Sequence, residues 1–378
     1  MRVAFDFNTV IKTRFSGFYT FGINLLQAFD RMPDSPEFRL FYSRRLENEA
    51  AQLKAQLSPA KFSFNATGVR INHLKTAWRW LGMPALQHFT GDFDLYHSFH
   101  NMMPPTRGKP RILTIHDLRR YRLPDFYGKA QQPVFERAVK AADHIIADSY
   151  ATRNDVMEIF RMPAGRVTAV PLACDPVLKP LSPEVKRIRR AQLCAQLDIP
   201  DTPYLLTISA TDHRKNILRT IQAFRQVKEQ LQEQIPQCKL LVAGFLPKLE
   251  REVVAIQTAA AADPDIVLAG PVDDLYAFTA CSEGLLFNSL YEGFGIPILE
   301  AFAFDVPVLT SNCSSMPEVG GDAALYADPL QTDAIADGIV KLTGNMRNQL
   351  IVRGQEQLQK FSWEETARQT MAVYRKLV

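Results

Sequence analysis

The stretch Tyr291–Phe304, YEGFGIPILEAFAF, holds the residues best suited to chemistry. Glu292 lies on a glycine-containing turn, and Glu300 follows eight positions later inside an apolar run. Gly293 and Gly295 let the backbone bend and approach a ligand closely, and a helix that begins near Gly295 would offer free amides to a phosphate. Carboxylates on both sides of a phosphate site suit a ligand with hydroxyls at two ends and a diphosphate between them, such as a nucleotide sugar.

These two acids also have a purely structural interpretation. Glu292 would then only favour the helix dipole, and Glu300 would be a surface acid. For Glu300 this interpretation is weak, because an unpaired carboxylate among Ile298 and Phe302 would be costly.

A second polar cluster follows the strand-like run Tyr204–Ile208. Arg214 and Lys215 lie where the next helix is expected to start, and two cations beside helix amides would hold a diphosphate. The alternative is a pair of solvated cations, which the helix dipole would disfavour at this position.

Two histidines end strand-like runs in the first half of the chain, His97 and His116. A histidine at the end of a buried strand can enter a cleft, although such a residue is commonly a satisfied structural group. His116 is placed to enter the cleft, with a satisfied structural residue as the alternative, and His97 either lines the acceptor side or simply ends its strand.

Strand-like and helix-like runs alternate, which predicts parallel sheets covered by helices on both faces. Residues 172–200 contain several prolines and are expected to connect two domains. We predict an α/β fold with two doubly wound, Rossmann-like domains facing a cleft. The expected ranges are 1–175 for the acceptor side, 176–360 for the nucleotide-sugar side, and 361–378 for a helix that packs back on the first domain.

Composition excludes several classes. The chain has 378 residues, 47% hydrophobic and 22% charged, which fits two globular domains. Without a long apolar run, and with Asp6 near the start, neither a membrane span nor a signal peptide is expected, so we expect a cytoplasmic protein. The five cysteines form no CxxC pair, and no GxGxxG motif follows the first strand of either half, which disfavours a zinc site and a nicotinamide dehydrogenase.

Charge is unevenly distributed, with 24 Lys/Arg against 16 Asp/Glu in residues 1–175. This asymmetry suggests a phosphorylated ligand or an anionic membrane as partner, and a solvated basic face is the alternative. Because the basic residues are dispersed and the net charge is only +4, no nucleic-acid partner is expected.

The stretch EGFGIPILEA resembles the signature of glycosyltransferase family four, a family of retaining enzymes with the GT-B fold. Its glutamate pair has seven residues between its members, as Glu292 and Glu300 do. The TIHDL stretch that contains His116 is also similar to a family motif, and the resemblance runs from Arg2 to the FSWEETA segment. It implies the GT-B fold and transfer of a sugar, with retention, from a nucleoside diphosphate to an acceptor hydroxyl.

The resemblance also implies roles for individual residues. Glu292 would contact the donor sugar, Glu300 the ribose, and main-chain amides near Gly295 the sugar or phosphate. The basic pair would neutralise the leaving diphosphate, and the histidine would reach the donor sugar. The expected catalytic residues are His116, Arg214, Lys215 and Glu292. The expected donor-binding residues are Gly17, Ser209, Phe294, Gly295, Ile296 and Glu300.

The sequence departs from the family pattern at several positions. Ser209 stands where most relatives have glycine, and Ala210 where many have an arginine, whose charge Arg214 is expected to supply. Asn288 replaces a common proline. Asp305 replaces a turn glycine and is expected to adopt the left-handed conformation.

The expected donor is GDP-mannose or a UDP-sugar, and the expected acceptor is a hydroxyl of a glycan or lipid-linked glycan in polysaccharide or glycoconjugate biosynthesis. No metal ion or cofactor is expected, because cations and amides can stabilise the leaving group. A nucleotide-sugar epimerase of the same architecture and a non-catalytic nucleotide-sugar binding protein are the alternatives. Residues 71–89 either contact the inner face of a membrane through Lys75, Arg79 and nearby aromatic rings, or form a helix pair that buries its tryptophans.

Overall fold

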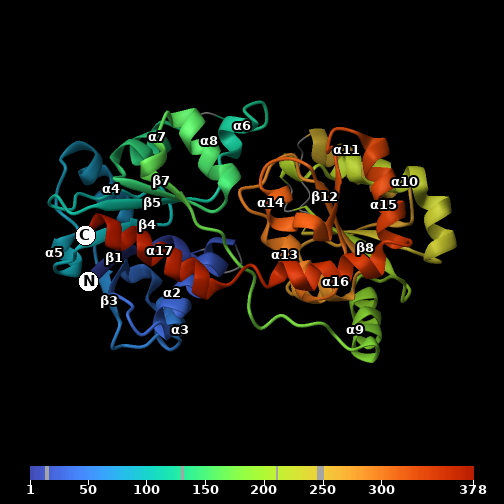
Figure 1. Cartoon of the computed structure of the whole chain (residues 1–378), viewed down its shortest axis with the longest axis horizontal. Coiled ribbons are helices and arrows are strands. Elements are labelled where there is room, and N and C mark those ends of the chain that lie inside the picture. Colours follow the sequence, from blue (N-terminus) through green and yellow to red (C-terminus); the bar gives the residue numbers. More distant parts are fainter. Residues whose placement is uncertain (13–16, 129–131, 210–211, 245–250) are drawn as a thin grey trace. The chain divides into compact units, whose positions relative to one another are not determined.

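Two parallel β-sheets organise the chain, one in each of two units (Figure 1). The computed structural model describes residues 1–12, 17–128, 132–209, 212–244 and 251–378. Unit 1 comprises Met1–Asp175 and Ser362–Val378, and unit 2 comprises Pro176–Phe361. The expected α/β class with parallel sheets is confirmed.

Within the described residues, seven parallel strands form the sheet of unit 1, in the order β3-β2-β1-β4-β5-β6-β7. Their bounds are β1 (Arg2–Asp6), β2 (Glu37–Ser43), β3 (Phe62–Thr67), β4 (Leu95–Ser98), β5 (Arg111–Ile115), β6 (His144–Ala147) and β7 (Val167–Ala169). Most are short apolar runs, as expected for strands buried on both faces. The chain order reverses between β1 and β4, which makes that point the topological switch of the sheet.

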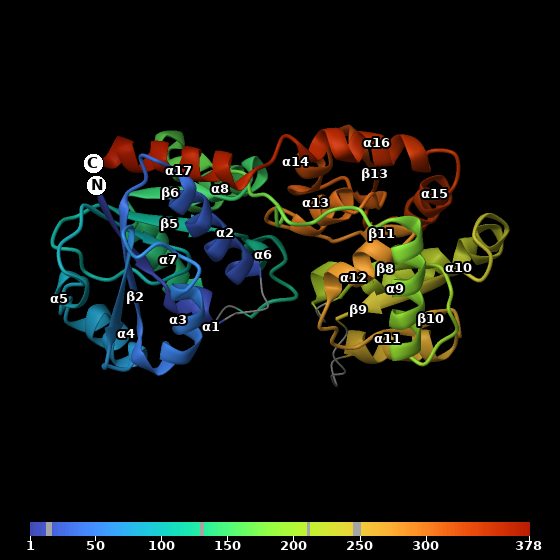
Figure 2. The same ribbon diagram turned by 90° about the horizontal axis from the view of Figure 1, so that it is seen from below.

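Helices pack around this sheet (Figure 2). They are α1 (Asn8–Lys12), α2 (Gly17–Arg31), α3 (Glu47–Lys54), α4 (Ile71–Trp80), α5 (Gln87–Thr90), α6 (Arg119–Arg122), α7 (Gln132–Ala141), α8 (Tyr150–Phe160) and α17 (Trp363–Leu377). Helix α2 begins at Gly17, and residues 13–16, which precede it, lie outside the described part. Gly22 is a packing residue of α2, since an added Cβ would overlap Val10 of α1.

The C-terminal helix α17 belongs to unit 1, as predicted. Trp363 is 1% exposed and donates from Nε1 to the carbonyl oxygen of Cys174 at 2.9 Å. At the other end of the helix, the Tyr374 hydroxyl lies 2.7 Å from His97 Nδ1, and its ring stacks on Phe29. His97 therefore ends its strand as a structural residue under α17, the second of the two interpretations.

The sheet of unit 2 has six parallel strands in the described part of the chain, in the order β10-β9-β8-β11-β12-β13. They are β8 (Tyr204–Ile208), β9 (Lys239–Ala243), β10 (Ile266–Leu268), β11 (Gly284–Phe287), β12 (Val308–Ser311) and β13 (Ala324–Ala327). Its helices are α9 (Pro183–Gln196), α10 (Ile217–Gln234), α11 (Arg251–Ala261), α12 (Leu275–Cys281), α13 (Ile296–Ala303), α14 (Met316–Gly320), α15 (Thr332–Thr343) and α16 (Arg347–Leu358).

One prediction in this unit is wrong: residues 172–200 are not all a connection, because α9 occupies much of them. Ser182 caps the helix by accepting from the amide of Val185, and Pro183 occupies its first turn, where a missing N–H costs nothing. The run of prolines obscured this helix-start signal.

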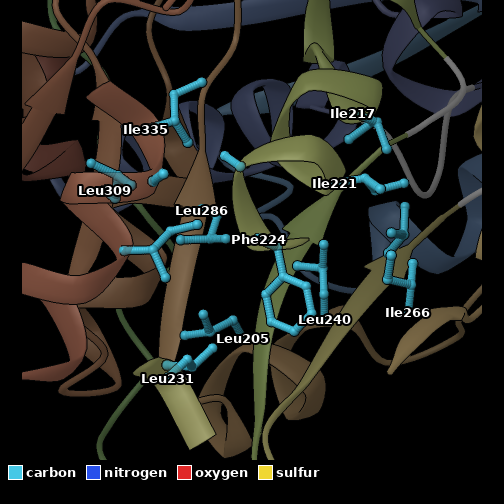
Figure 3. Close-up of a cluster of buried hydrophobic side chains, with 14 of the residues drawn as sticks. Leu205, Ile217, Ile221, Phe224, Leu231, Leu240, Ile266, Leu286, Leu309 and Ile335 are labelled. Atoms are coloured by element: carbon cyan, nitrogen blue, oxygen red, sulfur yellow. The ribbon is translucent and has the colours of Figure 1, made fainter. Parts of the chain in front are cut away.

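A hydrophobic core of unit 2 lies between its sheet and helices α10, α11 and α15 (Figure 3). Leu205, Leu286 and Leu309 project from β8, β11 and β12 into it, and Ile221 and Phe224 meet them from α10. This packing fixes the carboxyl ends of β8 and β11 next to each other.

None of the helices in the described part of the chain combines the length and apolar character needed to cross a bilayer.

The environment of His97 predicts a pH dependence of stability. Burial, with a smaller contribution from His116, lowers the pKa of His97 from 6.5 to about 3. Between these values the unfolded chain binds a proton that the folded chain does not, so the free energy of unfolding should fall as pH decreases from 6.5 toward 3. This one group contributes a slope of about 1.4 kcal/mol per pH unit. Urea unfolding at several pH values would measure it.

His97→Gln should remove that contribution to the slope, whatever its cost in overall stability. The matched control is His73→Gln, because His73 is exposed and should leave the slope as in the wild type. A slope that is equal in both variants would contradict the assignment.

Candidate active site

The polar residues predicted from the sequence of unit 2 gather at the topological switch point of its sheet. β8 continues to β9 and β10 on one side, while β11, β12 and β13 lie on the other, so the switch lies between β8 and β11. Arg214 and Lys215 follow β8, and Glu292 follows β11. Ligands of open parallel sheets bind beyond the carboxyl ends of the strands at this point.

Two cations and one carboxylate meet there in a buried cluster. Lys215 Nζ donates to Glu292 Oε1 at 2.8 Å, and Arg214 Nη1 forms an ion pair with Glu292 Oε2. Lys215 is 8% exposed and Glu292 is 7% exposed. The Lys215 ammonium also lies 4.5 Å from the centre of the Phe287 ring. Asp212 also pairs with Arg214, its Oδ2 lying 3.2 Å from Nε, so two carboxylates balance the two cations, and Glu292 contacts both of them.

The cluster fixes the ionisation of Glu292. Burial alone would raise the pKa of Glu292, but Lys215 and Arg214 lower it to about 2. The pKa of Lys215 moves down, because burial outweighs the opposing effect of Glu292. Glu292 is thus an acceptor-only carboxylate at neutral pH.

The two loops that supply these charges are also joined through the backbone. The amide of Leu290 donates to the carbonyl oxygen of Arg214 at 2.7 Å, and Arg214 Nη1 donates to the carbonyl oxygen of Tyr291 at 3.1 Å. Asp212 accepts from the amide and from Nε of Arg214, each at 3.2 Å. Arg214 is therefore held from both loops.

Arg214 and Lys215 precede the next helix, whereas they were predicted to lie at its start. The pair falls in a short 3₁₀-helix, His213–Lys215, and Asn216 in the left-handed conformation (φ 57°) separates it from the start of α10. The ring nitrogen Nδ1 of His213 contacts the carboxylate of Glu252 in α11. Ala210, expected to stand in the place of a family arginine, lies outside the described residues.

Helix α13 begins directly beyond Glu292, as predicted. Gly295 caps it with φ of 107°, a conformation that favours glycine, and the first amides of a helix have no partner within it. Phe294 is buried and packs edge-on against Phe361, with ring centres 5.8 Å apart. The amide of Ile296 opens the helix, and Glu300, at its fifth position, is 8% exposed. Glu300 is not a surface acid.

Two serines that the sequence analysis missed hold the loop of Glu292. The amide of Glu292 donates to Ser314 Oγ at 3.2 Å, and the Ser314 hydroxyl lies against the carbonyl oxygen of Glu292. Ser315 Oγ lies 3.0 Å from that carbonyl oxygen and 2.7 Å from that of Phe294. We call this pair the serine clasp. Its position just after β12 was the signal that could have identified it.

The positions of Ser209 and Gly17 do not test their expected contacts with the donor. Ser209 is 1% exposed, and its amide donates to the carbonyl oxygen of Ala243, so it extends the pairing of β8 and β9. Gly17 is the first residue of α2 in unit 1. Their expected donor contacts stay predictions.

Asp305 adopts the left-handed conformation, with φ of 58°, which confirms the expectation for this turn position.

His116 lies at the carboxyl end of β5 in unit 1. Its Nδ1 lies 2.6 Å from Asp148 Oδ2, and its Nε2 donates to the carbonyl oxygen of Phe99 at 3.1 Å. Burial would lower the pKa of His116, but the Asp148 carboxylate raises it above its usual value. Contact with a donor sugar stays a prediction, and it would require exchange of one of these hydrogen bonds.

Comparison with known proteins decides the family. Residues 34–178 match the family described as Glycosyltransferase Family 4, and residues 190–357 match the one described as Glycosyl transferases group 1. O-antigen chain mannosyltransferase B of Escherichia coli is 30% identical over 293 residues, which are 75% of this chain and 74% of that protein. The chain belongs to glycosyltransferase family 4. The glycosyltransferase is also 25% identical to MMP alpha-(1->4)-mannosyltransferase of Mycolicibacterium hassiacum over 354 residues, 82% of this chain and 80% of that one.

Solved structures show the same fold. HepE of Anabaena, in complex with UDP and glucose, aligns with a TM-score of 0.72 and 16% identity over 100% of both chains. WaaG, a glycosyltransferase involved in lipopolysaccharide biosynthesis, aligns with a TM-score of 0.69 and 16% identity, covering 98% of this chain and 99% of that one. The GT-B fold of the glycosyltransferase is therefore confirmed.

The buried cluster predicts unequal costs for its members. Glu292→Gln leaves two buried cations without their shared counter-charge and should lower the free energy of unfolding of the glycosyltransferase by about 3–5 kcal/mol. Lys215→Met should cost less, because Arg214 still pairs with Glu292. The double variant should be more stable than Glu292→Gln alone. Chemical denaturation at neutral pH would measure all three, and equal costs for the two single variants would contradict this account.

The serine clasp predicts a loss of activity beyond its loss of stability. Ser314 has φ of 57°, so Ser314→Gly removes the hydroxyl without backbone strain, and Ser315→Ala removes the second hydroxyl. The double variant should lose about 2 kcal/mol of stability and about tenfold in kcat, because Glu292 is no longer held in place. Steady-state kinetics well below the melting temperature would measure kcat.

The matched control for the clasp is Ser282→Ala. Ser282 is fully buried and donates to the carbonyl oxygen of Thr279 at 2.8 Å, but it precedes β11 and so lies at the opposite edge of the sheet. It should lower stability and leave kcat unchanged. An equal loss of kcat in this control would reduce the clasp to a general contribution to stability.

Proposed function

We propose that the protein transfers a sugar, with retention at the anomeric carbon, from a nucleoside diphosphate to a hydroxyl of a glycan. The observation that carries the proposal is the buried cluster of Arg214, Lys215 and Glu292 at the switch point of unit 2. Two cations beside the carboxylate of Glu292 suit a ligand that has phosphates and hydroxyls side by side.

In the proposed complex, the diphosphate lies against Arg214, Lys215 and the first amides of α13. Glu292 accepts hydrogen bonds from hydroxyls of the donor sugar, and Glu300, inside α13, accepts them from the ribose. The support is the burial of both carboxylates and the order of loop, helix start and helix interior along residues 292–300. An anion placed here would replace part of the charge that Glu292 supplies to the cations.

The proposed reaction breaks the bond between the anomeric carbon and the diphosphate oxygen, and the diphosphate leaves with the electron pair. The acceptor oxygen forms the new bond on the same face, and its proton passes to a diphosphate oxygen. Arg214 and Lys215 stabilise the negative charge of the leaving group, and they are in place before the reaction begins. Since these cations carry that function, we propose that no metal ion is needed.

A mannosyl donor, GDP-mannose, is the first candidate, because both relatives reported above are named mannosyltransferases. A UDP-sugar is the second, because HepE of similar fold is in complex with UDP and glucose. The proposed acceptor is a glycan hydroxyl in polysaccharide or glycoconjugate biosynthesis, free or lipid-linked, since one relative acts on O-antigen chains according to its name.

The test is a panel of GDP-, UDP-, ADP- and dTDP-sugars with glycan acceptors, scored by nucleotide release and by product analysis. We expect one donor to be strongly preferred, activity in the presence of EDTA, and a product with the anomeric configuration of the donor. Product with the opposite configuration would overturn retention. Interconversion of donor sugars without an acceptor would identify an epimerase, and binding without turnover would identify a non-catalytic protein.

Two neutral variants should separate binding from transfer. Glu292→Gln removes a carboxylate that competes with phosphate for the cations, so nucleoside diphosphate should bind as tightly as in the wild type or more tightly. Transfer should nevertheless slow by about 10- to 100-fold, because a charged hydrogen-bond acceptor for the sugar is lost. Lys215→Met should weaken nucleotide binding and slow transfer together. Calorimetric titration with the preferred nucleoside diphosphate measures the binding.

A loss of nucleotide affinity in Glu292→Gln equal to that in Lys215→Met, with both proteins folded, would show that the cluster is not a diphosphate site. The two variants differ in the sign of the charge removed, so each is the control for the other.

A further inference from the structure

Helix α4 of unit 1 ends in an exposed apolar tip. Trp80 is 71% exposed, Leu81 is 70% exposed and Met83 is 60% exposed. We call these three residues the tryptophan tip. Nowhere else among the described residues do three large hydrophobic side chains this exposed fall within four positions. Figures 1 and 2 show α4 at the periphery of unit 1.

The aromatic residues around the tip are divided between core and surface. Trp78 donates from Nε1 to the carbonyl oxygen of Pro84 at 2.8 Å and packs, together with Phe89, on the core cluster that contains Phe41. Of the two alternatives for residues 71–89, a helix pair that buries its tryptophans does not hold for Trp80, which is exposed, and holds only in part for Trp78, which is half-buried. Burial of Ile71, Leu74 and Trp78 holds the helix, so the tip projects from a fixed support.

The surroundings of the tip are basic. Between Glu49 and Asp92 the chain has no acidic residue, but it has five basic ones, Lys54, Lys61, Arg70, Lys75 and Arg79. The last three of these are exposed on or beside α4. The Arg79 guanidinium lies 5.1 Å from the centre of the Trp80 ring, so positive charge accompanies the exposed indole directly.

We propose that the tryptophan tip inserts into the interfacial layer of an anionic phospholipid bilayer. Tryptophan prefers this layer because its ring is apolar and its N–H is polar, and leucine and methionine bury readily beside it. The exposed cations attract the negative lipid surface while their aliphatic stems lie along the apolar layer. This charge complementarity favours an anionic bilayer over a protein partner.

The tip attaches the enzyme to the surface that holds lipid-linked acceptors. Only this statement about acceptors rests on the proposed function; the membrane contact itself depends on α4 alone. One small apolar tip with a few cations gives reversible binding rather than permanent anchoring. Unit 1 would then be recruited to the bilayer through this tip.

The chain contains its own reporter for this contact. Of its three tryptophans, all in the described part, Trp363 is 1% exposed, Trp78 is half-buried, and only Trp80 is strongly exposed. On adding vesicles of phosphatidylcholine with phosphatidylglycerol, we expect the emission of the full chain to move to shorter wavelength. Vesicles of phosphatidylcholine alone should cause a much smaller change. Co-sedimentation with the same vesicles measures affinity independently.

The variants separate the two contributions. Trp80→Ser with Leu81→Ser should abolish vesicle binding, and Lys75→Gln with Arg79→Gln should weaken it by about 30-fold. Trp80→Phe should still sediment with vesicles but lose the fluorescence shift. Leu330→Ser is the matched control, because Leu330 is an exposed apolar residue of unit 2 (61%) and should change nothing. All variants should keep wild-type thermal stability and transfer to a soluble acceptor.

Three outcomes would overturn the proposal. The first is no binding of the wild type to anionic vesicles, and the second is binding that Trp80→Ser with Leu81→Ser does not reduce. The third is a dimer in sedimentation velocity that this variant dissolves, which would assign the tip to a contact between copies of the chain. Because nucleotide release is measured without vesicles, failure of this proposal and failure of the proposed donor chemistry give different results.

Discussion

The energetic constraint on unit 2 is that three charges are buried together at the ends of two neighbouring strands. Charges taken out of water are costly unless they are paired, and here Glu292 pairs with both Arg214 and Lys215 while Asp212 pairs with Arg214 as well. The loops after β8, β11 and β12 are joined by hydrogen bonds that keep these groups together. In the proposed complex, an anionic ligand would take over part of the pairing that Glu292 supplies to the cations.

This constraint explains why the backbone around the cluster is held by hydrogen bonds and core packing. The sheet fixes β8 beside β11, the core under α10 and α15 fixes the sheet, and the serine clasp fixes the backbone on either side of Glu292. Unit 1 has a similar but smaller arrangement, in which Asp148, after β6, holds His116, after β5. In both units, polar side chains at one strand end are held by groups at the end of a neighbouring strand.

Elements of the fold could be predicted from the sequence where the local residue pattern itself determines the structure. The strand β8 was predicted with its observed limits, because a short apolar run between helical segments has few other uses. Glu292 was proposed as a site residue from a motif, and Lys215 from its place after a strand. Their ion pair depends on which strands are adjacent in the sheet, and the local sequence around each residue does not show this. Helix α9 was hidden by prolines, and Ser314 and Ser315 by the ordinary appearance of two serines in a loop. The contrast between Trp78 and Trp80 depends on which side of α4 faces the core.

The place of α17 has a consequence for how the protein is made. Trp363 and Tyr374 complete the interior of unit 1, yet the ribosome adds them only after it has synthesised all of unit 2. While the second unit is being synthesised, the first 175 residues lack α17. The surface that later contacts Trp363 and Tyr374 stays uncovered during that time. Synthesis order and folding order differ in this chain: the unit begun first is finished last.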